Sequence, residues 1–117
     1  MRMNEVSFDD SRPVDGYGPG FFRVGGEVMT GAVLLLPSGP RGWGGYADAA
    51  AVIAHAAEID VLLVGTGVEI AHIPAGLRAE IEAAGVGVEV MASATACRTY
   101  NVLLSEGRRV GVAMLPV

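Results

Sequence analysis

Residues 61–91, VLLVGTGVEIAHIPAGLRAEIEAAGVGVEVM, decide the fold. The segment begins with a short apolar run that predicts a buried strand, and the run ends at the turn Gly65-Thr66-Gly67. A helix is expected to begin at Pro74 and to end near Gly85, and residues 86–91 form the next predicted strand. A helical crossover of this length makes the two strands parallel, which is the repeating unit of an α/β fold.

Further strands and helices are predicted on both sides of residues 61–91. Residues 21–24 and 27–36 flank Gly25-Gly26 and predict a tight N-terminal hairpin. The remaining expected elements are a helix from an Asp48 cap to about Glu58, a helix from a Ser93 or Thr95 cap to about Glu106, and a last strand at residues 109–115. Residues 1–20 are read as a surface lead-in, of which 1–13 are expected to be flexible, and residues 37–46 as a loop. Residues 1–117 are therefore predicted to form a single domain, with one sheet covered by helices.

Composition excludes several classes of function. The 117 residues include 8 basic ones, all arginine, against 13 acidic ones, and the net charge is -5. A nucleic-acid partner is therefore not expected, because binding to phosphates depends on clustered positive charge. The apolar runs are too short to span a membrane, and the N-terminus has no signal-peptide core. Cys97 is the only cysteine, which fits a reducing, cytoplasmic location.

The turn Gly65-Thr66-Gly67 resembles the start of a dinucleotide-binding unit only in part. That fingerprint requires a third small residue where Ile70 stands, and its helix begins at once rather than at Pro74. We therefore expect no nicotinamide cofactor at this turn. A strand that leaves the sheet through a tight turn is the simpler interpretation.

The helix that follows residue 91 carries a second feature of interest, a polar edge with Arg98, Asn101 and Ser105. If the two central strands are parallel, the turn at Gly65, Thr66 and Gly67 and the start of this helix at Ser93 face one crevice. Free N–H groups and Arg98 would favour an anionic metabolite there. The alternative is that Arg98 and Asn101 are structural and hold loop carbonyls.

No catalytic residue and no metal site is predicted. Cys97 lies near a helix start, but it shares the apolar arc of that helix, where a packed thiol is the commoner outcome. His72 is the histidine whose spacing would allow it to act as a base, and His55 lies on another connection. Two histidines and one cysteine without close spacing make a poor metal site.

Several segments together resemble a known family. They are residues 14–26 (VDGYGPGFFRVGG), the loop from Leu36 to Trp43, residues 63–67 (LVGTG) and, above all, residues 96–110 (ACRTYNVLLSEGRRV). These segments are similar to the Mth938-like domain family, which includes the adipogenesis-associated domain protein and mitochondrial complex I assembly factor 3. The similarity covers about residues 14–115. The chain departs from the family at Ser93 and Thr95, where Thr and then Ala are usual.

The resemblance implies a three-layer α/β fold with a mixed sheet and an extra N-terminal hairpin. It does not imply an enzyme, since the mitochondrial relative acts as an assembly partner of respiratory complex I. The leading expectation is a noncatalytic protein-binding module that resembles such an assembly factor, with membrane-complex assembly partners and no cofactor. Residues that match the family motifs are the expected pocket, namely Gly65, Thr66, Gly67, Arg98, Thr99 and Asn101, to which Ser93 is added from the crevice argument. Trp43 and Tyr46 are the expected partner surface. The alternative function is a small anionic-metabolite-binding protein or weak enzyme that uses this crevice, and a homo-oligomer is also expected to be feasible.

Overall fold

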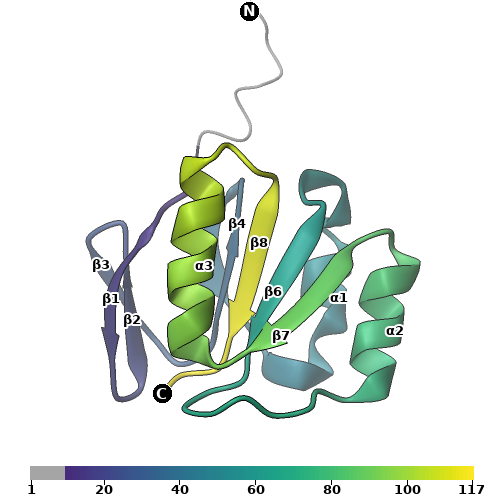
Figure 1. Ribbon diagram of the computed structural model, residues 1–117, viewed down its shortest axis with the longest axis horizontal. Helices are drawn as coiled ribbons and strands as arrows, with labels where there is room; N and C mark the ends of the chain where they lie inside the picture. The colour runs from purple at the N-terminus through teal and green to yellow at the C-terminus, as the bar shows by residue number, and fades with distance from the viewer. Residues whose placement is uncertain (1–9) are drawn as a thin grey trace, which may run out of the picture.

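The chain forms two β-sheets with helices packed against them, and the computed structural model describes residues 10–117 (Figure 1). The larger sheet has the strand order β5 (Gly39–Gly42), β4 (Val33–Leu36), β8 (Val110–Met114), β6 (Val61–Gly65) and β7 (Gly87–Met91). β6 runs parallel to β7 and β8, whereas β4 is antiparallel to β5 and β8, so this sheet is mixed. The parallel pair predicted from residues 61–91 is confirmed.

Helices cover both faces of the larger sheet and complete three layers. α1 (Ala49–Ile53) and α2 (Ala75–Ala83) pack on one face, and α3 (Ser93–Ser105) packs on the other. Leu62 and Val64 of β6 join the core under α1 and α2, while Leu63 joins the core under α3. Because strand side chains alternate between faces, a continuously apolar strand such as β6 needs cover on both sides. The predicted α/β fold class is confirmed.

The smaller sheet lies beside α3 and contains β1 (Val14–Gly18), β2 (Phe21–Val24) and β3 (Glu27–Thr30), paired antiparallel (Figure 1). Gly25 and Gly26 connect β2 to β3 with φ angles of 56° and 86°. A two-residue loop with two positive φ angles is the type I′ turn, which glycine adopts without steric cost. The predicted N-terminal hairpin is confirmed, and Phe22 and Val24 bury one side of it in the core under α3.

Three predicted strand limits are wrong. The single strand expected at residues 27–36 is two strands, because Gly31, with φ of 84°, redirects the chain from β3 in the small sheet to β4 in the large one. The loop expected at 37–46 contains β5, an edge strand in which Pro40 is tolerated because one side of the strand makes no ladder hydrogen bonds. Residues 14–18, expected to belong to the lead-in, form β1. Most of segment 1–13, for which flexibility was expected, lies outside the described residues.

The helix predicted from Asp48 to Glu58 is also shorter than expected. The Asp48 cap is confirmed, since its carboxylate accepts a hydrogen bond from the Ala51 N–H at 3.3 Å. α1 nevertheless ends at Ile53, and a separate 3-10 turn, η3 (Ala56–Glu58), follows. His55 leaves the helical conformation at φ of -117°, and its ring bonds to other side chains instead of facing solvent on a regular helix.

Candidate functional site

Ser93 joins the carboxyl ends of three strands of the large sheet. Its hydroxyl donates to the Leu115 carbonyl oxygen at 2.6 Å, just after β8, and accepts from the Gly67 N–H at 2.8 Å, just after β6. The Ser93 N–H in turn donates to the Gly67 carbonyl oxygen at 2.9 Å. Since Ser93 is fully buried, these polar groups depend on one another rather than on water. We refer to Gly65, Gly67, Ser93 and Leu115 as the closed junction.

The closed junction is tightly packed. A Cβ atom at Gly65 would lie 2.8 Å from Ser93 Oγ and 2.9 Å from Met114 Cγ, which is closer than real Cβ atoms approach. The structure thus brings Ser93 next to the Gly65-to-Gly67 turn, as the strand order predicts, but it fills the space between them. Binding of an anion at this turn stays a prediction.

The Ser93 side chain has a different role from the one expected for it. Ser93 or Thr95 was the predicted cap of the last helix, but α3 follows Ala92, and no side chain caps its N-terminus. The Ser93 hydroxyl bonds to Gly67 and Leu115 instead. Tertiary contacts with neighbouring strands therefore replace the local cap that the sequence favours.

Arg98, Thr99 and Asn101 lie further along α3 and differ in their surroundings. Arg98 is exposed, and its guanidinium donates to Thr95 Oγ1 at 3.4 Å, while Thr99 is half-buried. Asn101 clamps β1, since its side-chain oxygen accepts from the Val14 N–H at 2.9 Å and its amide donates to the Val14 carbonyl at 2.8 Å. Asn101 thus holds backbone groups, as the structural alternative expects, although that backbone belongs to a strand.

Thr66 shapes the segment that follows the closed junction. Its hydroxyl donates to the Glu69 carbonyl oxygen at 2.7 Å and accepts from the Ala71 N–H at 3.1 Å. Its backbone N–H donates to the Met91 carbonyl oxygen at 2.9 Å, at the end of β7. One side chain therefore folds residues 66–71 into a compact loop that is anchored beside β7.

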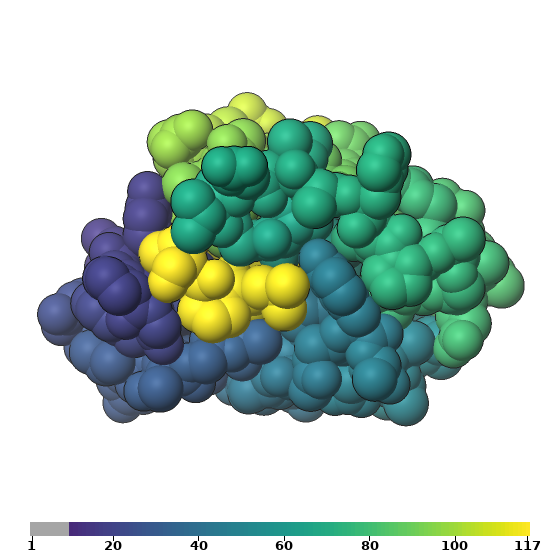
Figure 2. All heavy atoms as spheres, turned by 90° about the horizontal axis from the view of Figure 1, so that it is seen from below, coloured from purple at the N-terminus to yellow at the C-terminus, as the bar shows by residue number. Residues whose placement is uncertain are grey.

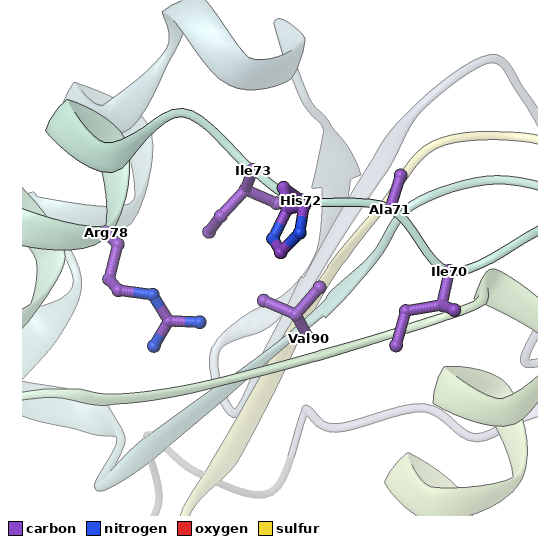
Figure 3. A pocket seen from close by; sticks show the side chains of 6 residues that line it. All are labelled: Ile70, Ala71, His72, Ile73, Arg78 and Val90. Carbon is purple, nitrogen blue, oxygen red and sulfur yellow. The ribbon is translucent and has the colours of Figure 1, made fainter.

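A pocket of about 340 Å³ opens between this loop, α2 and β7 (Figure 3). Its lining residues are Ile70, Ala71, His72, Ile73, Arg78 and Val90. Figure 3 shows the Arg78 guanidinium and the His72 ring pointing toward the space beside Val90. The carboxyl ends of parallel strands are where open α/β sheets usually bind ligands. The pocket thus combines an apolar lining with two groups that can donate hydrogen bonds to a carboxylate.

The same loop exposes two large apolar side chains. Val68 is 73% exposed and Ile70 is 67% exposed. Figure 2 shows this loop, coloured teal to green, spread over the lower face of the molecule beside the yellow C-terminal residues. Apolar area that stays in water favours contact with a partner. Sequence reasoning missed this surface, although β-branched residues at 68 and 70, outside every predicted helix and strand, were an available signal.

Trp43 and Tyr46 form an aromatic pair on the α1 side of the large sheet. Their ring centroids lie 6.1 Å apart at an interplanar angle of 72°. Trp43 is only 7% exposed and belongs to the core, and its indole N–H donates to the Asp48 carbonyl oxygen at 3.1 Å. The expectation that Trp43 faces a partner therefore conflicts with its burial, because the indole covers the start of α1. Tyr46 is half-buried, and a partner contact there stays a prediction.

Cys97 is a core thiol, as its place on the apolar arc predicts. It is 4% exposed, and its sulfur lies 3.5 Å from Met114 Sδ. Burial raises the pKa of the Cys97 thiol to about 11, and the nearby Arg98 charge offsets this only in part. A thiol that is protonated at neutral pH is a poor nucleophile, so this site does not support covalent catalysis.

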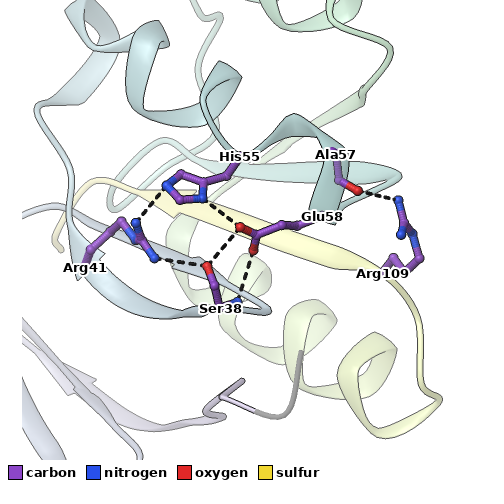
Figure 4. Close-up of polar contacts among 6 residues, drawn as sticks. All are labelled: Ser38, Arg41, His55, Ala57, Glu58 and Arg109. Atoms are coloured by element: carbon purple, nitrogen blue, oxygen red, sulfur yellow. Dashed lines mark hydrogen bonds and ion pairs between the residues drawn. The ribbon is translucent and has the colours of Figure 1, made fainter. Parts of the chain in front are cut away.

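A half-buried polar cluster links β5 to η3 (Figure 4). Arg41 Nη1 lies 2.8 Å from His55 Nε2, and Glu58 Oε2 lies 2.7 Å from His55 Nδ1. Because a guanidinium only donates, His55 Nε2 accepts and the ring proton sits on Nδ1, from which it is donated to Glu58. Ser38 donates to Glu58 through its N–H at 3.1 Å and its hydroxyl at 3.0 Å.

The hydrogen bonds of this polar cluster connect two surface elements and do not form a catalytic triad. Burial acts to raise the pKa of Glu58, but the hydrogen bonds from His55 and Ser38 outweigh it, and the pKa is lowered. Among these described residues, the Ser38 hydroxyl bonds to Glu58 rather than to His55, so the serine–histidine hydrogen bond of a nucleophilic triad is not formed. The cluster instead ties two surface elements together.

Metal and dinucleotide sites find no support in the described part of the chain. Within residues 10–117, no group of three or more His, Cys, Asp or Glu side chains is placed to hold a metal ion. α2 begins only at Ala75, so the Gly65-to-Gly67 turn does not open directly onto a helix as a dinucleotide site requires.

Comparison with known proteins identifies the family. A family model described as a protein of unknown function (DUF498/DUF598) matches residues 14–115. The chain belongs to the DUF498/DUF598 family. The match runs from the first residue of β1 to the residue after β8, so it includes the closed junction, the loop at 66–74 and the pocket.

Two relatives of this DUF498/DUF598 chain illustrate the range of similarity, one uncharacterized and one described as an assembly factor. An uncharacterized protein of Rhodobacter capsulatus is 51% identical over 117 residues, covering 100% of this chain and 94% of that protein. NADH dehydrogenase (ubiquinone) 1 alpha subcomplex assembly factor 3 of Danio rerio is 30% identical over 107 residues. That match covers 86% of this chain but 62% of the assembly factor, so the chain spans less than two thirds of that relative.

Solved structures with the same fold include an outer membrane protein from Bartonella henselae. It is 34% identical, with a TM-score of 0.85 over 94% of this chain and 98% of that one. A Bordetella pertussis protein described as a Mth938-like domain is 29% identical, with a TM-score of 0.75 over 99% and 92% of the two chains. The resemblance to the Mth938-like family is confirmed. In residues 10–117, no helix has the length and apolar character needed to cross a membrane.

Proposed function

We propose that this DUF498/DUF598 protein is a noncatalytic binding module that supports the assembly of a respiratory membrane complex. The observation that carries the proposal is the 30% identity to the complex I assembly factor over 86% of this chain. The matched region includes the exposed loop and the pocket beside β7, so the surface available for a partner lies within it. The partners proposed are subunits of the complex.

The chemistry of the described residues agrees with a binding role. Cys97, the one nucleophile that the sequence singles out, is buried and has its pKa raised to about 11. His55 is engaged by both Arg41 and Glu58. In contrast, Val68 and Ile70 present apolar area to solvent beside a pocket, which is an arrangement for contact with another molecule.

Deletion of the gene in the native host tests this function. We expect less fully assembled respiratory complex on native gels, restored by the wild-type chain, and subunits of the complex that copurify with the tagged protein. Normal assembly in the deletion strain, together with no copurifying membrane subunit, would contradict the proposal. Fractionation of the same cells tests the cytoplasmic location, and light scattering of the purified chain tests self-association.

A further inference from the structure

β7 is the outer strand of the large sheet, and half of its backbone groups point away from β6. The Gly87 N–H donates to the Asp60 carbonyl oxygen, and the Met91 carbonyl accepts from the Thr66 N–H, so residues 87 and 91 face β6. In a parallel ladder, alternate residues bond to the same side. Val88 and Val90 therefore present their N–H and carbonyl groups at the free edge of the sheet.

The Arg78 guanidinium beside this edge makes only long hydrogen bonds. Arg78 Nη1 reaches the Val88 carbonyl oxygen at 3.3 Å and Glu82 Oε2 at 3.4 Å. Both distances exceed the roughly 2.7–2.9 Å of good charge-assisted hydrogen bonds. The Arg78 side chain is 42% exposed. A carboxylate that approaches along the edge can thus replace these contacts with a shorter, bidentate one.

We propose that this edge is a strand-addition site for an extended segment of a partner protein, mainly apolar and with one Asp or Glu side chain. The backbone of the segment would pair with Val88 and Val90. One of its apolar side chains would fill the pocket beside Val90, and its carboxylate, two residues away on the same face, would bind Arg78. Ile70, which lines the pocket, would cover the segment from the loop side. We name Ile70, Arg78, Val88 and Val90 the open edge.

A second copy of this chain fits the open edge poorly. Two β7 strands that use all their outward groups pair Val88 with Val90 of the copy and place Glu89 directly opposite Glu89. Like charges in that position destabilise a strand pair, and each chain also carries a net charge of -5. The occupant is therefore a different protein.

This inference rests on the proposed function, and site-specific photo-crosslinking separates the two. The full chain is expressed in the native host with benzoylphenylalanine in place of Ile70, or in place of one of two exposed valines elsewhere. Val28 on β3 and Val102 on α3 are the matched controls, each 54% exposed. We expect crosslinks from position 70 to a subunit of the respiratory complex. Mass spectrometry should place them in an extended segment that contains Asp or Glu.

Two substitutions define the mode of binding. Val90→Pro removes an outward-facing N–H, which an edge strand tolerates, and it also replaces the Val90 side chain that lines the pocket. It should lower the crosslink yield by roughly fivefold or more, since one lost hydrogen bond alone accounts for about fivefold. Arg78→Gln keeps a side chain that can bond to Val88 but removes the charge, and it should lower the yield as well. Circular dichroism confirms that each variant is folded.

The outcomes are distinct. Crosslinks from positions 28 or 102 but not 70 would overturn the open edge and leave the proposed function standing. Crosslinks from position 70 to a second copy, or a yield unchanged in folded Val90→Pro, would overturn strand addition by a partner. If Val90→Pro does not fold, an unchanged yield in Arg78→Gln overturns the predicted carboxylate contact. No protein crosslinked from any position, with normal complex assembly on deletion, would overturn both proposals.

Discussion

The closed junction and the open edge are neighbours at one end of the large sheet, but they differ in whether their polar groups are hydrogen-bonded within the chain. In the closed junction, Ser93 satisfies the Gly67 N–H and the Leu115 carbonyl, and Gly65 leaves no room for a Cβ atom. At the open edge, Val88 and Val90 direct backbone groups outward beside an apolar pocket. One region is complete within the chain, and the other offers groups to a partner.

Residues of the closed junction therefore stabilise the fold, whereas residues of the open edge contact the partner. Thr66 connects the two regions, because its N–H bonds to the end of β7 and its hydroxyl folds the loop that exposes Val68 and Ile70. Substitutions in the closed junction should therefore act on stability. Substitution of an exposed side chain at the open edge, such as Ile70, should act on binding and leave stability almost unchanged.

The largest loss of stability is expected for Ser93→Ala. It leaves the Gly67 N–H and the Leu115 carbonyl without their hydroxyl partner, and each unpaired buried group costs about 1–3 kcal/mol. We expect the free energy of unfolding to fall by roughly 2–4 kcal/mol, measured by urea denaturation. Ser105→Ala is the matched control, since that hydroxyl is exposed and bonds only to Val102 in its own helix. A loss no greater than that of the control would show that the junction is not stabilising.

A smaller loss is expected where α3 clamps the small sheet. Asn101→Ala removes both hydrogen bonds to Val14 and should lower the free energy of unfolding by about 1–2 kcal/mol. Hydrogen exchange should increase first in β1, because that strand loses its attachment to the helix. Arg98→Ala, an exposed neighbour, should change stability by less than about 0.5 kcal/mol. Equal effects of the two substitutions would contradict the clamp.

Acid should weaken the polar cluster between β5 and η3. The pKa of Glu58 is lowered in the folded chain, so its contribution to stability is present above the ordinary value of 4.5 and is lost as the pH falls through the folded pKa. Urea midpoints measured from about pH 7 down to about pH 3 should fall less steeply for Glu58→Gln than for wild type. Glu80→Gln, at an exposed helix position, is the control. Parallel pH profiles of wild type and Glu58→Gln would refute this role.

The smallest effect on stability is expected in the exposed loop that follows the closed junction. Val68 is 73% exposed, so Val68→Ser should change the free energy of unfolding by less than about 0.5 kcal/mol. A loss of more than about 1 kcal/mol would mean that this loop packs within the fold, which its exposure contradicts.

The sequence predicts the parallel pair at the centre of the large sheet well because its signals are local. A short apolar strand, a helix of known length and a second strand define a parallel pair without knowledge of tertiary contacts. The hairpin at Gly25-Gly26 is equally local. The break between β3 and β4 was not predicted, because the positive φ of Gly31 cannot be read from the residue type alone. Strand β5 was not predicted, because Gly39–Gly42 lacks β-prone side chains.

The predicted pocket residues come from the end of β6 and the start of α3, and ligand binding there stays a prediction. Gly65, Gly67 and Ser93 do lie together, yet the geometry that closes them depends on Leu115, from a distant part of the chain. The outward direction of Val88 and Val90 depends on strand order and register. Neither property is encoded in a motif of consecutive residues, so both required the structure.

Amide hydrogen exchange of the free chain tests the contrast most directly. We expect alternation along β7, with slow exchange at Glu89 and Met91, whose N–H groups face β6, and fast exchange at Val88 and Val90. Gly67 and Ser93, in the closed junction, should exchange as slowly as the core strands. Protection of Val88 and Val90 equal to that of Glu89 in the free monomer would show that this edge is already covered within the chain and cannot receive a partner strand.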